Sequence, residues 1–303
     1  MTIPASTLHS SEIESYSKYH SPIEDSSRQL NDYTNRVIES AVADANQHAT
    51  CSNVRLIRAV SERLSRPLVS QLESHVLNNS KDYPQNRYRV DKSSFRGFFV
   101  LHVMDAVPIG RLGSLVRIGN VYTGTDKIGH FHTEGYRYFR KHYLEGKPLE
   151  EVLQWGDRTE RSYFGGYATG IYSWGDLSAN FNGMRFFADL VPGYEDPLNI
   201  NHAPMIQCEN NQWVIGRKFD WRDYIDHSFD EGINCNSFSR KGLLDKHLVN
   251  VGLLSRKHGI DVGCYPAPSQ IEAIKNKYKE YYPYIFNLSL RNSTIDEIDN
   301  SRM

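Results

Sequence analysis

The chain has 303 residues, of which 39% are hydrophobic and 12% aromatic. This is enough apolar material to bury a sizeable core without disulfides or structural metals. Lys and Arg number 35 against 36 Asp and Glu, which gives a net charge of −1. Broad electrostatic capture of nucleic acid needs clustered positive charge, so we expect no nucleic-acid partner.

Both ends of the chain are polar. Residues 1–25 are Ser-rich and lack a long apolar stretch, so we expect a disordered tail and no secretory signal peptide. Residues 291–303 predict a second flexible tail, which leaves a single domain over residues 26–290. The apolar run near residues 96–110 includes charged residues and is too short to cross a bilayer as a helix. We expect a soluble protein, cytoplasmic or secreted without a cleavable signal peptide, with at most peripheral membrane contact.

The first half of the chain is predicted to be helical. Residues 30–49 and 53–77 carry apolar residues at steps of three or four, the periodicity of amphipathic helices. Pro67 lies inside the second segment, where we expect it to kink the helix. Residues 93–107 form a candidate for a buried helix, and residues 123–139 form the next predicted helix.

The second half adds helices around one β element. Residues 149–170 and 174–190 predict two helices, followed by a β-hairpin at 205–219 around an Asn-Asn turn. Helical patterns return at 240–256 and 269–286. We therefore predict a mainly α protein, a helical bundle with a small β-hairpin insertion.

The four cysteines, Cys51, Cys208, Cys235 and Cys264, are widely spaced along the chain. There is no Cys-x-x-Cys pair and no Cys/His spacing of a structural zinc site. Four cysteines leave several pairings open. We expect the thiols to stay free and, where a disulfide forms, place it among the last three.

Asp126, His130 and Glu134 recur at spacings of four within the helix predicted for residues 123–139. Residues four apart lie on one stripe of a helix. A carboxylate and an imidazole one turn apart can share a divalent metal ion, or the carboxylate can orient the imidazole as a general base. The structural alternative is an acidic residue at a helix N-terminus and a hydrogen-bonded core histidine. His132 lies off the stripe, and we expect it to be a packing or surface histidine.

A second polar cluster follows in Glu160, Ser173, Asp176 and Asn180. Asp176 and Asn180 are four apart and share a helix face. Ser173 is placed to cap this helix, with Asp176 at its third position. Asn180, with Gly183 one turn on, indicates an internal hydrogen bond or a close helix contact.

The order of these motifs resembles the VanZ-like and YfiM-like group of small bacterial proteins. The shared pattern is D-K-x-x-H-F, a later Glu and then S-x-x-D-x-x-x-N-x-x-G, and it covers about residues 120–190. The matching residues are Asp126, Lys127, His130, Phe131, Glu160, Ser173, Asp176, Asn180 and Gly183. The resemblance implies a shared polar helical core and a cell-envelope or lipid-related role. Members of that group are often membrane-embedded or lipoproteins, whereas this sequence predicts neither a membrane span nor a lipid anchor.

These residues lead to one functional hypothesis. We predict that His130 and Asp176 approach each other with Glu160 in the same cluster, because burying each polar group alone is costly. The predicted chemistry is metal-assisted or acid–base hydrolysis of a cell-envelope or lipid-related substrate. The roles are as follows: catalytic, His130, Asp176 and Glu160; ligands of one divalent metal ion, Asp126, His130 and Glu134; structural or substrate-binding, Ser173 and Asn180.

The alternative is a non-enzymatic interaction protein, including a secreted effector, in which the polar cluster only specifies the packing. Two other catalytic sites have weaker support. Cys235, with His227 nearby, would be a thiol nucleophile, although a buried structural cysteine is the simpler interpretation. Glu134 or Glu160 with Asp176 would be a glycosidase carboxylate pair. The acidic and aromatic stretch DYIDHSFDEGIN could supply a pocket wall, but a solvated loop is the favoured interpretation.

Overall fold

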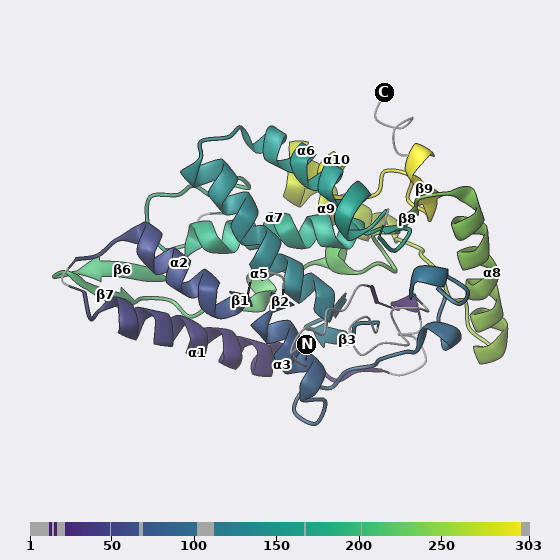
Figure 1. The fold of residues 1–303 in the computed structure, drawn as a ribbon, viewed down its shortest axis with the longest axis horizontal. Helices are drawn as coiled ribbons and strands as arrows, with labels where there is room; N and C mark the ends of the chain where they lie inside the picture. Colours follow the sequence, from purple (N-terminus) through teal and green to yellow (C-terminus); the bar gives the residue numbers. More distant parts are fainter. Residues whose placement is uncertain are drawn as a thin grey trace, which may run out of the picture.

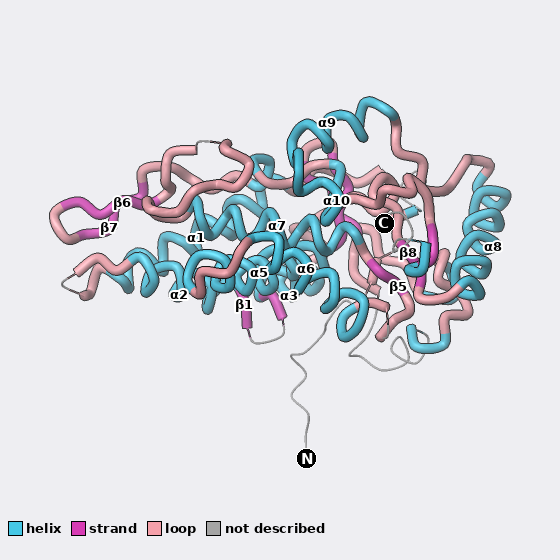
Figure 2. The backbone as a smooth tube through the Cα atoms, turned by 90° about the horizontal axis from the view of Figure 1, so that it is seen from above, coloured by secondary structure: helices cyan, strands magenta, loops and turns pink. Residues whose placement is uncertain are grey.

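The computed structural model describes residues 12–13, 15–16, 22–48, 50–66, 69–101, 112–166, 168–200 and 202–297. These residues form a mainly α structure, as predicted, together with four small sheets. The molecule is elongated, with the strands β6 (Ile206–Glu209) and β7 (Gln212–Ile215) at one end and the helix α8 (Lys241–His258) at the other (Figures 1 and 2). In the described part of the chain, no helix combines the length and the apolarity needed to cross a membrane.

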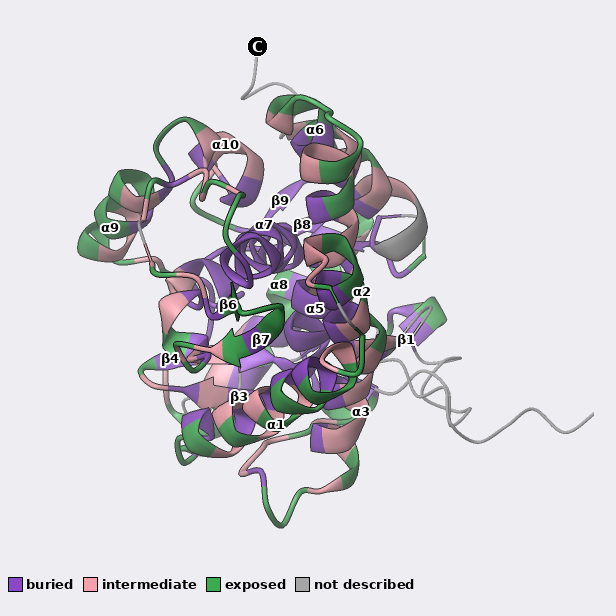
Figure 3. Ribbon diagram, turned by 90° about the vertical axis from the view of Figure 1, so that its left-hand side faces the viewer, coloured by how far each residue is buried: buried purple, intermediate pink, exposed green. Residues whose placement is uncertain are grey.

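Two helices form the centre of the molecule, α5 (Thr125–Phe139) and α7 (Trp174–Asp189). Every residue of α7 is buried, and Figure 3 shows this helix enclosed by other elements. The two helices meet at Gly135 and Gly183. A methyl group placed on Gly183 would lie 1.9 Å from the backbone oxygen of Phe131 and 3.0 Å from the Cα atom of Gly135. This approach requires glycine, and it brings the polar side chains of the two helices together.

The remaining helices surround this pair. They are α1 (Ser27–Ala45), α2 (Asn53–Leu64), α3 (Gln71–Asn78), α6 (Leu149–Thr159), α9 (Pro268–Tyr278) and α10 (Tyr282–Ile285). Helices α2 and α3 contact α5, whereas α6 and α10 contact α7. A π-helical turn extends α5 over Arg140–Leu144 and α6 over Glu160–Phe164. Short 3-10 turns occur at Val90–Lys92, Trp221–Asp223, His227–Phe229 and Lys279–Tyr281.

Short strands fix the start of both central helices. The other strands are β1 (Ser65–Arg66), β2 (Val69–Ser70), β3 (Leu115–Ile118), β4 (Val121–Gly124), β5 (Ile171–Tyr172), β8 (Ser237–Phe238) and β9 (Ser293–Thr294). The pairs β1–β2, β3–β4, β6–β7 and β5–β8 are antiparallel, and β8–β9 is parallel. Strand β4 runs directly into α5, and β5 leads through Ser173 into α7. Asn210 and Asn211, both with positive φ, form the two-residue turn between β6 and β7.

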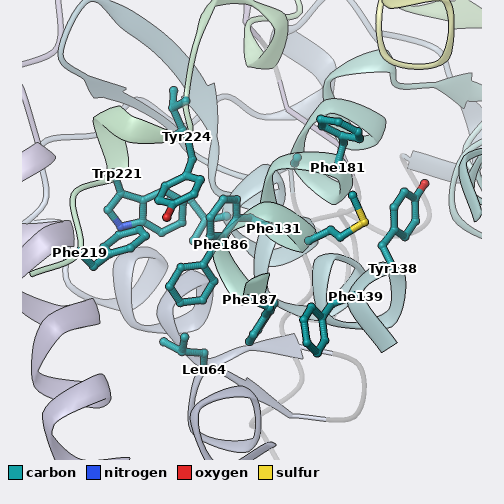
Figure 4. Packing of buried hydrophobic residues seen from close by; sticks show 14 of the residues in the cluster. Leu64, Phe131, Tyr138, Phe139, Phe181, Phe186, Phe187, Phe219, Trp221 and Tyr224 are labelled. Carbon is teal, nitrogen blue, oxygen red and sulfur yellow. The ribbon is translucent and has the colours of Figure 1, made fainter. Parts of the chain in front are cut away.

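Aromatic side chains fill one side of the α5–α7 pair (Figure 4). The ring of Phe131 on α5 lies 4.6 Å from that of Trp221 and 5.4 Å from that of Phe186 on α7. Phe219 and Tyr224 stack with their ring planes 9° apart. Burial of each such side chain stabilises the fold by roughly 1.5–3 kcal/mol, so these apolar contacts supply a large part of the free energy that holds the central helices together.

The predicted continuous helix over residues 53–77 is wrong. The segment forms two helices, α2 and α3, with the strands β1 and β2 between them. Ser70 starts α3 anew, because its hydroxyl oxygen accepts a hydrogen bond from the amide of Glu73 (3.3 Å). Pro67, which we expected to kink the helix, lies outside the described residues.

The predicted helix at residues 93–107 is wrong at its start. Residues 93–98 form turns, in which the Ser93 hydroxyl accepts a hydrogen bond from the amide of Phe95 (3.1 Å). Such local side-chain bonds offer the backbone an alternative to the helix. Residues 102–107 lie outside the described residues.

Part of the segment expected to be an N-terminal tail is buried. Ile13 and Tyr16 have no exposed surface, and Ile13 packs with Ile23 and Leu115. The backbone oxygen of Glu12 accepts a hydrogen bond from an amide of another segment, that of Gly113 (2.7 Å). These positions therefore belong to the folded core.

Two disulfides join Cys51 to Cys208 and Cys235 to Cys264. The expectation of free thiols is wrong. A disulfide among the last three cysteines is present as Cys235–Cys264, whereas the pairing of Cys51 with Cys208 was not predicted. Strand β6 carries Cys208 to the connection between α1 and α2, where Cys51 lies. This proximity comes from the tertiary fold and has no signature in the spacing of the cysteines.

We expect Gly183→Ala to lower the free energy of unfolding by about 3 kcal/mol, because the added methyl group cannot be placed without separating α5 from α7. Gly242→Ala is the matched control. A Cβ atom at Gly242, in the first turn of α8, meets nothing within 4 Å, so alanine should be neutral or stabilise by up to about 1 kcal/mol. Chemical denaturation measures both variants. Equal stability of the two would contradict the close contact of the central helices.

Candidate functional site

The polar cluster lies where the N-terminal halves of α5 and α7 face each other. Asp126 and Lys127 are in the first turn of α5, and His130 follows one turn later. Ser173 caps α7, because its hydroxyl oxygen accepts a hydrogen bond from the amide of Asp176 (3.2 Å), which confirms the predicted cap. Both helix starts therefore direct ionisable side chains into one buried region.

Lys127 is the centre of this cluster. Its side chain has no exposed surface, and its ammonium nitrogen lies 2.8 Å from Asp126 Oδ2 and 3.1 Å from Asp176 Oδ1. It also pairs with Glu231, which is equally buried. Burial opposes the charge on Lys127, but Asp126, Asp176 and Glu231 outweigh it and raise the pKa of this amine well above its usual value. The ammonium is thus held charged at every physiological pH.

Sequence reasoning missed the roles of Lys127 and Glu231. Lys127 belongs to the D-K-x-x-H-F pattern, so the sequence indicated that it is part of the motif but did not indicate that it pairs with the buried carboxylates. Glu231 lies in the acidic stretch that we expected to be a solvated loop, and that expectation is wrong. Ser228, Phe229 and Glu231 have no exposed surface. The sequence did offer one indication that this stretch is buried, because its acidic residues alternate with Phe and Ile.

His130 lies between the surface of the protein and Asp176, one of the partners of Lys127. Its Nε2 atom lies 3.3 Å from Asp176 Oδ2, and its Nδ1 atom lies 3.1 Å from Asn180 Oδ1. Both neighbours are hydrogen-bond acceptors, so a protonated ring satisfies both. Burial opposes the charge on His130, but Asp176, Glu160 and the other nearby carboxylates raise its pKa to about 9. The predicted approach of His130 and Asp176 is confirmed.

Glu160 belongs to the same cluster, as predicted. It is the first residue of the π-helical turn after α6, and its Oε1 atom accepts a hydrogen bond from the amide of Ser173 (3.0 Å). Burial and the charge of Asp176 raise the pKa of Glu160 to about 8. Its side chain is therefore neutral at pH 7 and can donate a proton. Single π-helical turns of this kind are frequent at functional sites.

Glu231 and one further carboxyl group, that of Glu12, complete the cluster. Glu231 accepts hydrogen bonds from Ser173 Oγ (3.0 Å) and Asn236 Nδ2 (2.9 Å), and burial raises its pKa to about 7. Glu12 enters from the N-terminal segment and accepts a hydrogen bond from Thr169 Oγ1 (2.6 Å). Burial and the charge of Glu231 raise the pKa of Glu12 well above its usual value. The cluster has more carboxyl groups than cations, and it compensates by retaining protons.

A narrow recess opens beside His130. It is too tight to hold a water molecule. It is lined by His130, Glu134, Tyr138, Trp155, Gly156, Thr159, Glu160 and Asn180. Glu134 is 8% exposed and pairs with the guanidinium of Arg137 (2.7 Å). The recess thus brings His130 together with the two glutamates, while Asp176 and Lys127 lie behind it.

Three carboxylates lie close enough together to bind one cation. Of the predicted metal ligands, only Asp126 is among them. Among the described residues, oxygens of Asp126, Asp176 and Glu231 lie within 4.8 Å of one another, a spacing that could hold a metal ion. However, the ammonium of Lys127 already bonds to all three carboxylates. The ring nitrogens of His130 face acceptors, as described above, and so present no lone pair to a metal ion. The arrangement suits proton transfer better than metal binding.

Other histidines and cysteines do not take part in the site. His132 is fully buried against Phe131 and Trp221, which agrees with a packing role, and burial lowers its pKa to about 3. The proposed thiol nucleophile is wrong, because Cys235 is joined to Cys264 in a disulfide.

A larger cavity of about 260 Å³ lies between α1, α2 and β7, with Arg55, Arg63 and Trp213 in its wall. It shares no lining residue with the recess beside His130, and Arg63 is already paired with Asp44. Size alone does not make a catalytic site, so the smaller recess beside His130 is the stronger candidate.

Comparison with protein-family models, curated proteins and solved structures finds no match to this chain. The functional argument therefore depends on the geometry of the cluster.

We expect Lys127→Met to lower the free energy of unfolding by about 3–5 kcal/mol, because it leaves Asp126, Asp176 and Glu231 buried without their cation. Lys147→Met removes a lysine whose side chain is 51% exposed and pairs with Glu151, and should change stability by less than about 1 kcal/mol.

Denaturation of both variants, with and without added Ca²⁺ or Mn²⁺, provides the measurement. A divalent ion that stabilises only Lys127→Met would show that the ammonium occupies a potential metal position. A loss no larger than that of Lys147→Met would contradict the central role of Lys127.

A second prediction concerns alkaline pH. Folding raises the pKa of Glu160 from 4.5 to about 8 and that of His130 from 6.5 to about 9, so the folded state binds more protons than the unfolded state between these values. The resulting stability is complete below the unfolded values and is lost as the pH rises through about 8 and 9.

Glu160→Gln keeps the acceptor for the Ser173 amide and stays neutral. We expect this variant to lose about 1.4 kcal/mol less stability than the wild type between pH 7 and pH 9. Glu39→Gln, at an exposed position of α1, is the control and should follow the wild type. Parallel curves for Glu160→Gln and the wild type would mean that Glu160 is already ionised at pH 7.

Proposed function

We propose that the cluster is the acid–base site of a hydrolase. The supporting observation is His130, which lies in the wall of the recess with its side chain 18% exposed and bonds to Asp176 behind it. A carboxylate that holds an imidazole in one orientation is the usual arrangement of a catalytic histidine. Asp176 is suited to this role, because His130 and Lys127 overcome the effect of burial and lower its pKa.

The two glutamates of the recess differ in environment, as an acid and a base should. Glu160 is neutral at pH 7 and would protonate the leaving group. Burial raises the pKa of Glu134, with the guanidinium of Arg137 opposing this, and Glu134 would take a proton from the attacking water as a base of raised pKa. The charged ring of His130 between them would stabilise negative charge that develops during the reaction. Asn180 would fix the ring through its Nδ1 atom, and Ser173 would keep Glu160 in place.

The resemblance to the VanZ-like and YfiM-like group suggests a cell-envelope or lipid-related substrate. We propose that the matching residues form a site common to that group. Two disulfides favour an oxidising compartment, so of the two expected locations secretion fits better than the cytoplasm.

The narrowness of the recess favours the second candidate, an interaction protein in which the cluster is structural. A substrate can reach His130 only if side chains such as Trp155 move. Buried networks of this kind also serve to specify packing. The two functions differ in what happens when His130 is truncated.

We expect His130→Ala to reduce turnover by at least about 100-fold while costing less stability than Asn180→Leu. Asn180→Leu removes the acceptor of His130 Nδ1 and adds bulk one turn before Gly183, for a loss of about 1–3 kcal/mol from each effect. His48→Ala, at an exposed position, is the control for both measurements.

Activity would be screened on a panel of p-nitrophenyl esters, phosphates and glycosides, and stability by thermal melts. Elemental analysis of the purified protein tests the metal-assisted variant of the mechanism. A lower melting temperature for His130→Ala than for Asn180→Leu, without turnover of any probe by the wild type, would favour the structural function.

A further inference from the structure

We propose that the outer face of α8 is a binding surface for anionic lipid. This helix lies at one end of the elongated molecule, away from the α5–α7 pair (Figures 1 and 2). The inference is independent of the polar cluster and of the proposed hydrolysis.

One side of α8 holds the helix to the protein. Leu244, Val251 and Leu254 are buried on this side, and His247 is enclosed by aromatic rings, including that of Phe95. Asn250 donates hydrogen bonds to the backbone oxygens of the turn that precedes residue 98. The orientation of the helix is therefore fixed, and so is the face that it presents to solvent.

The opposite side of α8 is apolar where a surface helix would normally be charged. Leu248, Val249 and Leu253 are 49%, 62% and 44% exposed, and Gly252 lies between them. Positions 248, 249, 252 and 253 are neighbours on a helix surface, so they form one continuous apolar face. Phe99 extends the apolar surface of this end of the molecule with 79% exposure.

Positive charges flank this apolar face at both ends of the helix. The helix Lys241–His258 contains four basic residues, Lys241, Lys246, Arg256 and Lys257, against the single acidic residue Asp245. Four minus one leaves a charge of +3 on α8, in a chain whose total is −1. The sequence between residues 247 and 255 contains no Asp, Glu, Lys or Arg. Lys241 is paired with Asp245, and Lys246 donates a hydrogen bond to the backbone oxygen of Gly97, so the attraction to an anionic surface comes mainly from Arg256 and Lys257 in the last turn.

This distribution fits a lipid surface better than a protein partner. A helix that lies in the plane of a membrane buries its apolar face at the boundary of the headgroups and extends Lys and Arg to the phosphates. Each basic residue near an anionic membrane adds attraction that salt screens. The lining of the two pockets described above includes no residue of α8.

The test is flotation of the full-length protein with vesicles of phosphatidylcholine, alone or mixed with phosphatidylglycerol. We expect binding to the mixed vesicles only, and weaker binding at high salt. Val249→Gln with Leu253→Gln should reduce the partition coefficient by at least about tenfold. The matched control is Val54→Gln with Val214→Gln, two valines that are 48% and 41% exposed elsewhere, and it should bind like the wild type.

Arg256→Gln with Lys257→Gln should weaken binding to the mixed vesicles about tenfold and reduce its dependence on salt. Thermal melts would show that each variant is folded, since all these side chains are exposed. The proposal is overturned if the wild type does not float with the mixed vesicles, or if the Val249/Leu253 variant floats equally well. It is also overturned if sedimentation shows a wild-type dimer, without lipid binding, that this variant dissociates, because a second copy would then cover the face.

Discussion

The structure depends on one buried ammonium group. Lys127 is held among Asp126, Asp176 and Glu231, and these residues come from α5, α7 and the segment before β8. Charges this deeply buried cost several kcal/mol each unless they are paired. The position of each segment is therefore constrained by the same cation, and a shift of any one of them would leave an unpaired charge in the core.

The apolar packing offsets the free-energy cost of burying these charges. The glycine contact between α5 and α7 brings the two helix backbones close together, and the aromatic rings around Phe131 fill one side of the pair. The polar cluster occupies the N-terminal ends, where the strands β4 and β5 fix the start of each helix. The ionisable groups and the apolar contacts thus lie on different parts of the same two helices. The N-terminal ends carry the charges, and the rest of the helix pair supplies the apolar contacts that stabilise it.

The sequence predicted the helices that carry the site. The order of the motifs, together with the cost of burying each polar group alone, was enough to predict that His130, Asp176 and Glu160 lie in one cluster. The sequence did not predict Glu12 or Glu231, because they reach the site from segments with no regular periodicity. It also missed the pairing of Cys51 with Cys208, which depends on where β6 folds back. Local patterns report the face of a helix, whereas contacts between distant segments depend on the packing of the whole chain.

The closed recess and the raised pKa values have one common consequence. Glu160 is neutral because burial and the charge of Asp176 raise its pKa to about 8, against the opposing effects of His130 and of the hydrogen bond from the Ser173 amide. The recess has walls from α5, from α7 and from α6, which carries Trp155 and ends next to Glu160. A movement of Trp155 that admits a substrate would also bring water to Glu160 and lower its pKa. Glu160 would therefore keep its proton for the leaving group only while the bound substrate excludes water from the recess.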